Sequence, residues 1–219
     1  MWIGRVPYRE AWALQESLRR RILDGEAAET ILLVEHPAVI TLGRSANPNH
    51  VLLDEAALAA RGIDLVRTNR GGDVTWHGPG QLLAYPILRL HRGVVAHVEA
   101  MARAVIDLVR PLGVEGEFRR ARAGVWVGDR KLCAFGVHVS RRVAVHGLAL
   151  NLTTPTDAFS LIVPCGLRDA GVTSLAELTG AAPSVASFAE PLAGALLKAF
   201  ERDRRVATEG AEKTSARIA

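Results

Sequence analysis

Three consecutive apolar segments joined by very short polar turns restrict the fold of this chain most strongly. The segments are Ala123–Asp129, Lys131–Val139 and Arg142–Leu152. Asp129-Arg130 joins the first pair, and Ser140-Arg141-Arg142 joins the second pair. A parallel crossover needs about a dozen residues or more, whereas turns of hairpin length join antiparallel neighbours. These segments therefore predict three antiparallel strands in one sheet.

The rest of the chain alternates between helical periodicity and short apolar runs. The predicted helices are Arg9–Glu26, Asp54–Arg61, Val94–Leu112, Thr173–Gly180 and Ser184–Asp203. The further predicted strands are Ile31–His36, Ala38–Gly43, Ile63–Thr68, Asp73–His77 and Gln81–Leu90. Because strands outnumber helices, we predict an α+β fold in which helices pack on a mainly antiparallel or mixed sheet.

Length, charge and cysteine content narrow the organisation of the chain further. Its 219 residues suit a single domain over residues 1–205, followed by a polar tail, 206–219, that we expect to fray. No run approaches the roughly 18–20 apolar residues of a membrane span, and the first residues do not resemble a signal peptide. Two cysteines provide no disulfide framework, so we predict a cytoplasmic protein. The net charge of +4 favours acidic partners, whereas the aromatic content of 5% gives no support for nucleic-acid binding.

The glycine-rich stretch "RGGDVTWHGPGQ", Arg70 to Gln81, is the first candidate for a binding site. A phosphate-binding P-loop needs a lysine after its last glycine, where this chain has Gln81. A dinucleotide fingerprint opens a helix, and here a strand is predicted to follow. Glycine turns let backbone N–H groups approach a ligand closely, so the stretch fits the wall of another kind of pocket. Two ordinary turns around a strand remain an equal alternative.

A second candidate is Cys165, which lies between Pro164 and Gly166 in "SLIVPCGL". This turn context favours an exposed thiol, which needs a nearby cation or base to become a thiolate. The candidate activators are His36, His77, His138, His146 and Lys131. Lys131 stands out because the chain has only three lysines and otherwise prefers arginine, which cannot release its proton in proteins.

Cys133 follows Lys131 by two positions, so a regular strand places both side chains on one face. We interpret Cys133 as a small core residue. The spacing of Cys133, His138, His146 and Cys165 matches no zinc motif, so no metal site is predicted.

Four motifs follow one another along the chain. They are "EHPAVITLGRS" (Glu35–Ser45), "RGGDVTWHGPGQLLAYPI" (Arg70–Ile87), "RKLCAFGVHV" with "HGLALN" (Arg130–Val139 and His146–Asn151), and "VPCGL" (Val163–Leu167). In this order they resemble the motifs of the lipoyl/octanoyl transferase family. Together they span most of the chain. The resemblance implies the fold of biotin and lipoate protein ligases.

The resemblance also implies an activity: transfer of an octanoyl or lipoyl group from acyl carrier protein to a lysine of a lipoyl-domain protein. Cys165 would carry the acyl group as a thioester and Lys131 would be its partner. The stretches that would enclose the substrate are Arg70, Gly71, Gly72, Asp73, Val74, Thr75, Trp76 and His77, then Ala134, Phe135 and Gly136, then Gly147, Leu148 and Ala149. His36 is a further candidate near the reactive centre.

By the same resemblance, the acceptors would be lipoyl domains of 2-oxoacid dehydrogenase complexes and the glycine cleavage H protein. The family needs no ATP, metal or other cofactor, and we expect a monomer. Two positions differ from the family's usual pattern: Cys133 replaces a small residue, and Trp76 replaces Tyr or Phe. If Trp76 lies on the wall of the acyl chamber, the chamber is narrower.

Three other functions remain open from the residues. An ATP-dependent lipoate or biotin ligase on the same scaffold would not need Cys165. A Cys–His hydrolase would use His77 or His146 as its base. A non-catalytic protein that binds lipoyl domains would need neither group.

Overall fold

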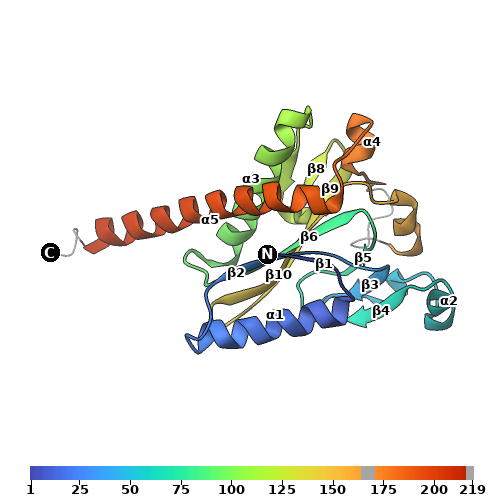
Figure 1. Ribbon diagram of the computed structural model, residues 1–219, viewed down its shortest axis with the longest axis horizontal. Helices are drawn as coiled ribbons and strands as arrows, with labels where there is room; N and C mark the ends of the chain where they lie inside the picture. Colours follow the sequence, from blue (N-terminus) through green and yellow to red (C-terminus); the bar gives the residue numbers. More distant parts are fainter. Residues whose placement is uncertain (164–170, 216–219) are drawn as a thin grey trace.

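The computed structural model describes residues 1–163 and 171–215, with side chains as far as Thr208. Its main feature is a sheet of eight strands, Figure 1. The order across this sheet is β1 (Trp2–Arg5), β2 (Thr30–Glu35), β6 (Gln81–Ile87), β10 (Val143–Asn151), β9 (Arg130–Ser140), β8 (Gly124–Val127) and β7 (Glu117–Arg119), and β11 (Gly171–Val172) pairs with β9. A second sheet has the order β4 (Asp64–Arg67), β3 (Val39–Leu42), β5 (Val74–His77).

The predicted antiparallel run of β8, β9 and β10 is present, and β10 continues the antiparallel pattern into β6 and β2. Parallel pairing occurs between β1 and β2, between β11 and β9, and between β3 and β4. The sheet is therefore mixed, and the predicted α+β class is confirmed.

Helices cover both faces of the large sheet, as Figure 1 shows. α3 (Gly93–Val109) and α5 (Val185–Ser215) pack together on one face, and α1 (Tyr8–Leu23) packs on the other. Alternate residues of the central strands supply the two cores: Leu33 and Ala84 face α3 and α5, whereas Leu32 and Leu83 face α1. Each of these leucines stabilises the fold by about 1.5–3 kcal/mol through its burial. Burial on both faces explains why these strands read as continuous apolar runs.

β2 and β3 follow each other in the sequence but belong to different sheets. The chain leaves the large sheet at His36-Pro37, so β2 and β3 do not pair, and it returns through the Gly78-Pro79-Gly80 turn between β5 and β6. The small sheet, with α2 (Glu55–Ala59) beside it, therefore stands next to the large sheet with a connection at each end. This arrangement leaves a cavity between the two sheets.

The prediction that the last helix ends near Asp203 is wrong, because α5 continues to Ser215. The residues after Asp203 are polar but include Ala, Glu and Arg, which favour helix, and Arg204, the first residue past the predicted end, pairs with Glu29. The short strands β1, β7 and β11 were not predicted. Within the described residues, no helix is both long and apolar enough to cross a membrane.

Candidate active site

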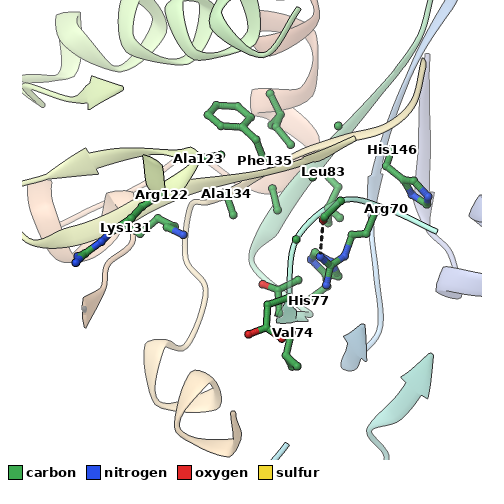
Figure 2. Close-up of a pocket in the computed structure, with 18 of the residues that line it drawn as sticks. Arg70, Val74, His77, Leu83, Arg122, Ala123, Lys131, Ala134, Phe135 and His146 are labelled. Carbon is green, nitrogen blue, oxygen red and sulfur yellow. Dashed lines mark hydrogen bonds between the residues drawn. The ribbon is translucent and has the colours of Figure 1, made fainter. Parts of the chain in front are cut away.

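A cavity of about 630 Å³ lies between the two sheets, Figure 2. Its walls come from β5, β6, β9 and β10, from the turn at Arg70–Asp73, and from a short 3-10 helix, η3 (Arg120–Arg122). Leu83, Phe135 and Leu148 make much of the lining apolar. A concave, mostly apolar cavity of this size, with a few polar groups, is typical of a small-molecule site.

Lys131 enters this cavity from the β8 side, and Figure 2 shows its amine pointing inward. The expectation that Lys131 and Cys133 share a face is wrong. The pairing of β8 with β9 shifts between Val125 and Trp126, so Val125 faces Cys133 while Trp126 faces Lys131. Leu132 is the extra residue of this bulge, and such a bulge re-aims a side chain. Cys133 is consequently buried under α3 and α5, where burial raises the pKa of its thiol and keeps it protonated.

Most of the predicted substrate-binding residues line the cavity. They are Arg70, Gly71, Gly72, Asp73, Val74, Thr75, His77, Ala134, Phe135, Gly136, Gly147, Leu148 and Ala149. Their contact with a substrate stays a prediction. Cys165, the predicted nucleophile, lies outside the described residues.

Trp76 is an exception, and its predicted place on the cavity wall is wrong. Val74, Thr75 and His77 of β5 line the cavity, whereas Trp76 is not among the lining residues. Its ring packs edge-on against Phe159, with 5.6 Å between centroids, in the core of the small sheet. The indole therefore does not narrow the cavity directly.

Arg70 holds the glycine turn in place. Its Nη2 atom donates to the carbonyl oxygen of Thr41 at 2.7 Å and to the Thr41 hydroxyl at 2.8 Å, and Nη1 donates to the Gly71 carbonyl at 3.1 Å. The Gly71 N–H in turn donates to Val137 O at 3.0 Å. The turn is thus fixed to β3 on one side and to β9 on the other.

A chain of buried side chains links His77 to the strand beside Lys131. Asn151 donates from Nδ2 to the Thr173 carbonyl at 2.9 Å and accepts from Gln81 Nε2 at 2.8 Å. Gln81 Oε1 is then the acceptor for His77 Nδ1–H at 2.7 Å, which assigns the proton of the imidazole to Nδ1. The Thr173 N–H closes the chain by donating to Lys131 O at 3.0 Å. Burial, the nearby His36 and the Arg70 charge lower the pKa of His77 well below its usual value.

His36 lies behind the cavity rather than on its wall. Its Nδ1–H donates to Val6 O at 2.6 Å, and its Nε2 accepts from the Tyr85 hydroxyl at 2.7 Å. Burial lowers the pKa of His36 to about 4, so the ring is neutral at physiological pH. His36 thereby orients Tyr85, which does line the cavity.

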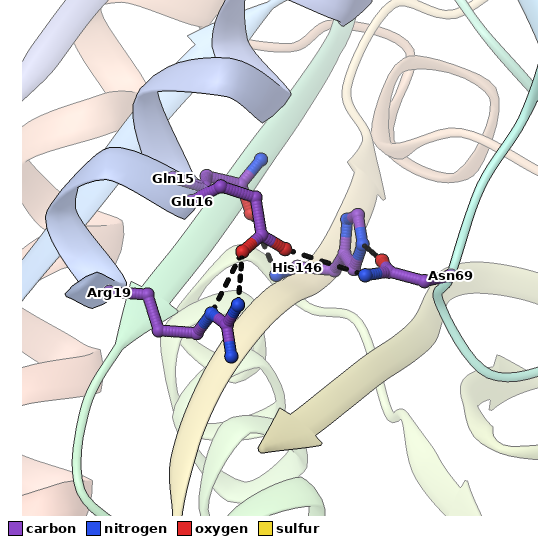
Figure 3. Close-up of polar contacts among 5 residues, drawn as sticks. All are labelled: Gln15, Glu16, Arg19, Asn69 and His146. Carbon is purple, nitrogen blue, oxygen red and sulfur yellow. Dashed lines mark hydrogen bonds and ion pairs between the residues drawn. The ribbon is translucent and has the colours of Figure 1, made fainter. Parts of the chain in front are cut away.

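His146 closes the side of the cavity opposite Lys131 (Figure 2), and Figure 3 shows its contacts with Gln15 and Asn69. Its backbone has φ of 58°, in the left-handed region, and its N–H donates to Gln15 Oε1 at 2.7 Å. Its Nε2–H donates to Asn69 Oδ1 at 2.6 Å, and Asn69 is also held by Glu16 of α1 at 3.4 Å. Burial lowers the pKa of His146 to about 3.

The two candidate bases for a Cys–His hydrolase are therefore poorly suited to that role. His77 and His146 are both buried, and burial holds the pKa of each below its usual value. Both nitrogens of each ring have hydrogen-bond partners within the protein, the remaining contacts being Thr41 for His77 and Tyr8 for His146, each at 3.4 Å. His138 does not line the cavity. Among the side chains described, no group of three or more His, Cys, Asp or Glu residues could hold a metal ion.

The sequence matches the lipoyl protein ligase A/B catalytic domain over residues 7–197. The chain belongs to this family. An octanoyltransferase of Chloroflexus aggregans is 44% identical over 205 residues, which cover 91% of this chain and 93% of the relative. An octanoyltransferase of Solibacter usitatus is 48% identical over 179 residues, covering 80% and 81% of the two chains.

The fold of the family recurs in solved structures of low sequence identity. A putative lipoate protein ligase of T. acidophilum with bound lipoic acid aligns with a TM-score of 0.70 at 17% identity, covering 93% of this chain and 85% of that one. Lipoate-protein ligase A bound with ATP aligns with a TM-score of 0.66 at 14% identity, covering 94% and 83%. The family and the ligase-like fold predicted from the four motifs are confirmed.

Several lining residues of this family member were missed by sequence reasoning. Tyr8, Gln81, Tyr85, Trp126 and Asn151 all line the cavity. Gln81, Tyr85 and Asn151 are polar residues within otherwise apolar strands, a signal that could have identified them. Nothing local distinguishes Tyr8 or Trp126 from an ordinary core residue.

Proposed function

We propose that this protein transfers an octanoyl or lipoyl group from acyl carrier protein to a lysine of lipoyl-domain proteins. Two observations together carry the proposal. The chain is 44–48% identical to octanoyltransferases, and its own two sheets enclose an apolar cavity with Lys131 at the edge. An extended acyl chain fits between Leu83, Phe135 and Leu148, where each buried methylene contributes about 0.8 kcal/mol.

The proposed chemistry proceeds through a thioester on Cys165. The Cys165 thiolate attacks the donor thioester, a new C–S bond forms, and the carrier thiol leaves with a proton. The acceptor lysine amine then attacks this thioester, the amide forms, and the Cys165 thiol is released. Exchange of one thioester for another is nearly isoenergetic, and amide formation makes the second step favourable, so no ATP is required. No metal or other cofactor takes part in this scheme.

Lys131 has two roles in this proposal. As an ammonium it stabilises the Cys165 thiolate, and as an amine it accepts the proton of the attacking lysine. Backbone N–H groups of the glycine turns would stabilise the tetrahedral oxyanion, at ~3–4 kcal/mol for one donor. The walls at Gly72 and Gly136 bring such backbone close to the cavity, whereas the Gly71 N–H is bonded to Val137 O.

The proposed acceptors are lipoyl domains of 2-oxoacid dehydrogenase complexes and the glycine cleavage H protein. A net charge of +4 favours encounter with acidic carrier and acceptor domains. We propose that the protein works as a cytoplasmic monomer.

The test is intact-mass analysis of the purified protein after mixing with octanoyl-acyl carrier protein, without ATP. We expect an octanoyl adduct that is absent in Cys165→Ser, and transfer of the group to an added lipoyl domain. A strict requirement for ATP would instead identify a ligase and overturn the proposal. Lys131→Arg separates the transferase from a Cys–His hydrolase: we expect near-complete loss of transfer, and a hydrolase would retain its activity. Unaltered lipoyl-domain binding with no adduct under any condition would identify a binding protein.

A further inference from the structure

The amine of Lys131 lies against an aromatic face. Its Nζ atom is 4.9 Å from the centroid of the Trp126 ring. Trp126 is only 1% exposed and lines the cavity beside Lys131. Tryptophan is the strongest neutral aromatic partner for a cation at this distance, because its ring carries negative charge density on its face.

Two features of the backbone build this contact. The bulge at Leu132 places Lys131 directly opposite Trp126, on the face that lines the cavity. The absence of a side chain at Gly124 leaves room for both groups, since a Cβ there would lie 3.1 Å from Lys131 Cε and 3.1 Å from Trp126 Nε1. The same Cβ would lie 2.8 Å from the Cys133 carbonyl oxygen, so a larger residue at Gly124 would disturb the strand pairing as well as the lysine and the indole.

The indole itself is held in a fixed orientation. Its Nε1–H donates to the backbone carbonyl of Arg122 at 3.1 Å. The guanidinium of Arg119 also lies 5.2 Å from the ring, and it is tied to Glu117 and Asp129 by ion pairs. A ring fixed by these neighbours presents a surface of constant position to the lysine amine.

We propose that Trp126 is a positioning residue that holds the Lys131 amine at the edge of the cavity through a cation–π contact. This inference rests on the proposed role of Lys131 in acyl transfer. The side chain of lysine has four rotatable bonds, so an additional fixed contact narrows the positions that its amine samples. Restricting it raises the fraction of molecules in which the amine is ready to stabilise the thiolate.

A purely space-filling role for Trp126 predicts a different result from the cation–π contact. If Trp126 contributes only volume, replacing its hydrogens by fluorine leaves the fold and the lysine unchanged. If its π-electrons hold the ammonium, each added fluorine withdraws charge from the ring face and weakens the contact. We expect complete loss of the contact to reduce the rate of acyl-enzyme formation by about 2- to 30-fold, the equivalent of ~0.5–2 kcal/mol.

The first measurement examines the contact without reference to catalysis. The chain has only three lysines, Lys131, Lys198 and Lys213, so a protein labelled with ¹³C at lysine Cε gives three resolvable signals. We expect the Lys131 signal, assigned by its loss in Lys131→Met, to show protons shifted upfield by the indole ring current. Trp126→Leu should abolish this upfield shift, and Trp126→Phe should leave part of it. An unshifted Lys131 signal in the unmodified protein would overturn the proposal.

The second measurement examines the effect on the reaction. Mono-, di- and trifluorotryptophan are placed at position 126, and the single-turnover rate of octanoyl transfer to the enzyme is measured for each. We expect the logarithm of the rate to fall in steps with the number of fluorine atoms. The control carries the same residues at Trp2 in β1, which is 36% exposed and does not line the cavity, and there the rate should not change.

The outcomes separate this inference from the proposed function. A flat rate series at position 126 in an enzyme that is acylated normally would overturn the role of Trp126 and leave the transferase in place. If the unmodified protein forms no acyl-enzyme, the proposed function fails, and the ring-current measurement still decides whether the lysine and indole are in contact. The fluorinated variants keep the shape of the indole, so a folding defect of Trp126→Leu does not prevent the test.

Discussion

Replacing His146 by glycine and by alanine separates the backbone strain at this position from the loss of its imidazole. Both variants lose the hydrogen bond to Asn69 and leave the same vacancy beside the cavity. They differ in how well their backbone tolerates a φ of 58°. The hydrogen bond from the residue 146 N–H to Gln15 and the path of β10 impose this angle. The difference in stability between them therefore measures the backbone conformation alone.

The magnitude follows from two opposing effects. An L-residue in the left-handed region costs roughly 1–2 kcal/mol, a cost that glycine avoids. Glycine loses more conformational entropy on folding, which costs ~0.5–1 kcal/mol relative to alanine. We expect His146→Gly to be more stable than His146→Ala by up to ~1.5 kcal/mol, which corresponds to a difference of up to ~6 °C in Tm for a chain of this size.

The assay is urea unfolding of both variants at constant pH, with the slopes compared to verify that the unfolding transitions are equivalent. The matched control is Val145, the preceding residue of β10, which is not among the residues with positive φ. There the order should reverse, since alanine is favoured over glycine in a regular strand. If His146→Ala proved as stable as His146→Gly, or more stable, the reasoning from backbone strain would be refuted.

Three further predictions concern the cavity wall and the buried core. Gly43→Ala places a Cβ 2.2 Å from the Gly72 carbonyl oxygen, so we expect the free energy of unfolding in urea to fall by ~1–3 kcal/mol and acylation of the enzyme to weaken. In the control, Gly194→Ala, the added methyl meets nothing, and the protein should not be destabilised. Burial lowers the pKa of His97 to about 4, below the 6.5 of the unfolded chain, so neutral His97 favours the folded state above pH 6.5, and the protein loses up to ~3 kcal/mol of stability as the pH falls toward 4. The free energy of unfolding should therefore depend less steeply on pH between 6.5 and 4 in His97→Leu than in the unmodified protein. Equal slopes in the two proteins would contradict the assignment. Trp76→Phe should lower the unfolding midpoint but leave the preference among acyl donors of different length unchanged, and a changed preference would mean that the indole shapes the cavity after all.

The sheet was predictable because its signals are local. Hairpin turns after Val127 and Ser140 leave no room for a crossover, and the apolar runs between them are long enough for strands. Prediction failed where pairing depended on distant partners. β2 and β3 are adjacent in sequence but join different sheets, and the three residues of β7 form a strand only because β8 is there to pair with them.

The candidate site shows the same division. Its motifs, read by resemblance, identified the segments that surround the cavity, and most of the named residues do line it. The motifs did not predict the orientation of every side chain within its segment. Trp76 was expected on the wall and packs behind it, while Gln81 and Asn151 were overlooked and form the hydrogen-bonded link between His77 and Thr173. Such links join residues far apart in the chain, and no local pattern encodes them.

By itself, the amino-acid sequence determined the class of fold, the antiparallel core and the family, because apolar periodicity, turn length and motif order are properties of neighbouring residues. Only the tertiary structure decided which way Lys131 points. A regular strand would direct it with Cys133 toward the helices, and a single extra residue at Leu132 turns it to the cavity and to Trp126 instead. That bulge arises from the pairing of β8 with β9, a constraint that exists only once the two strands meet.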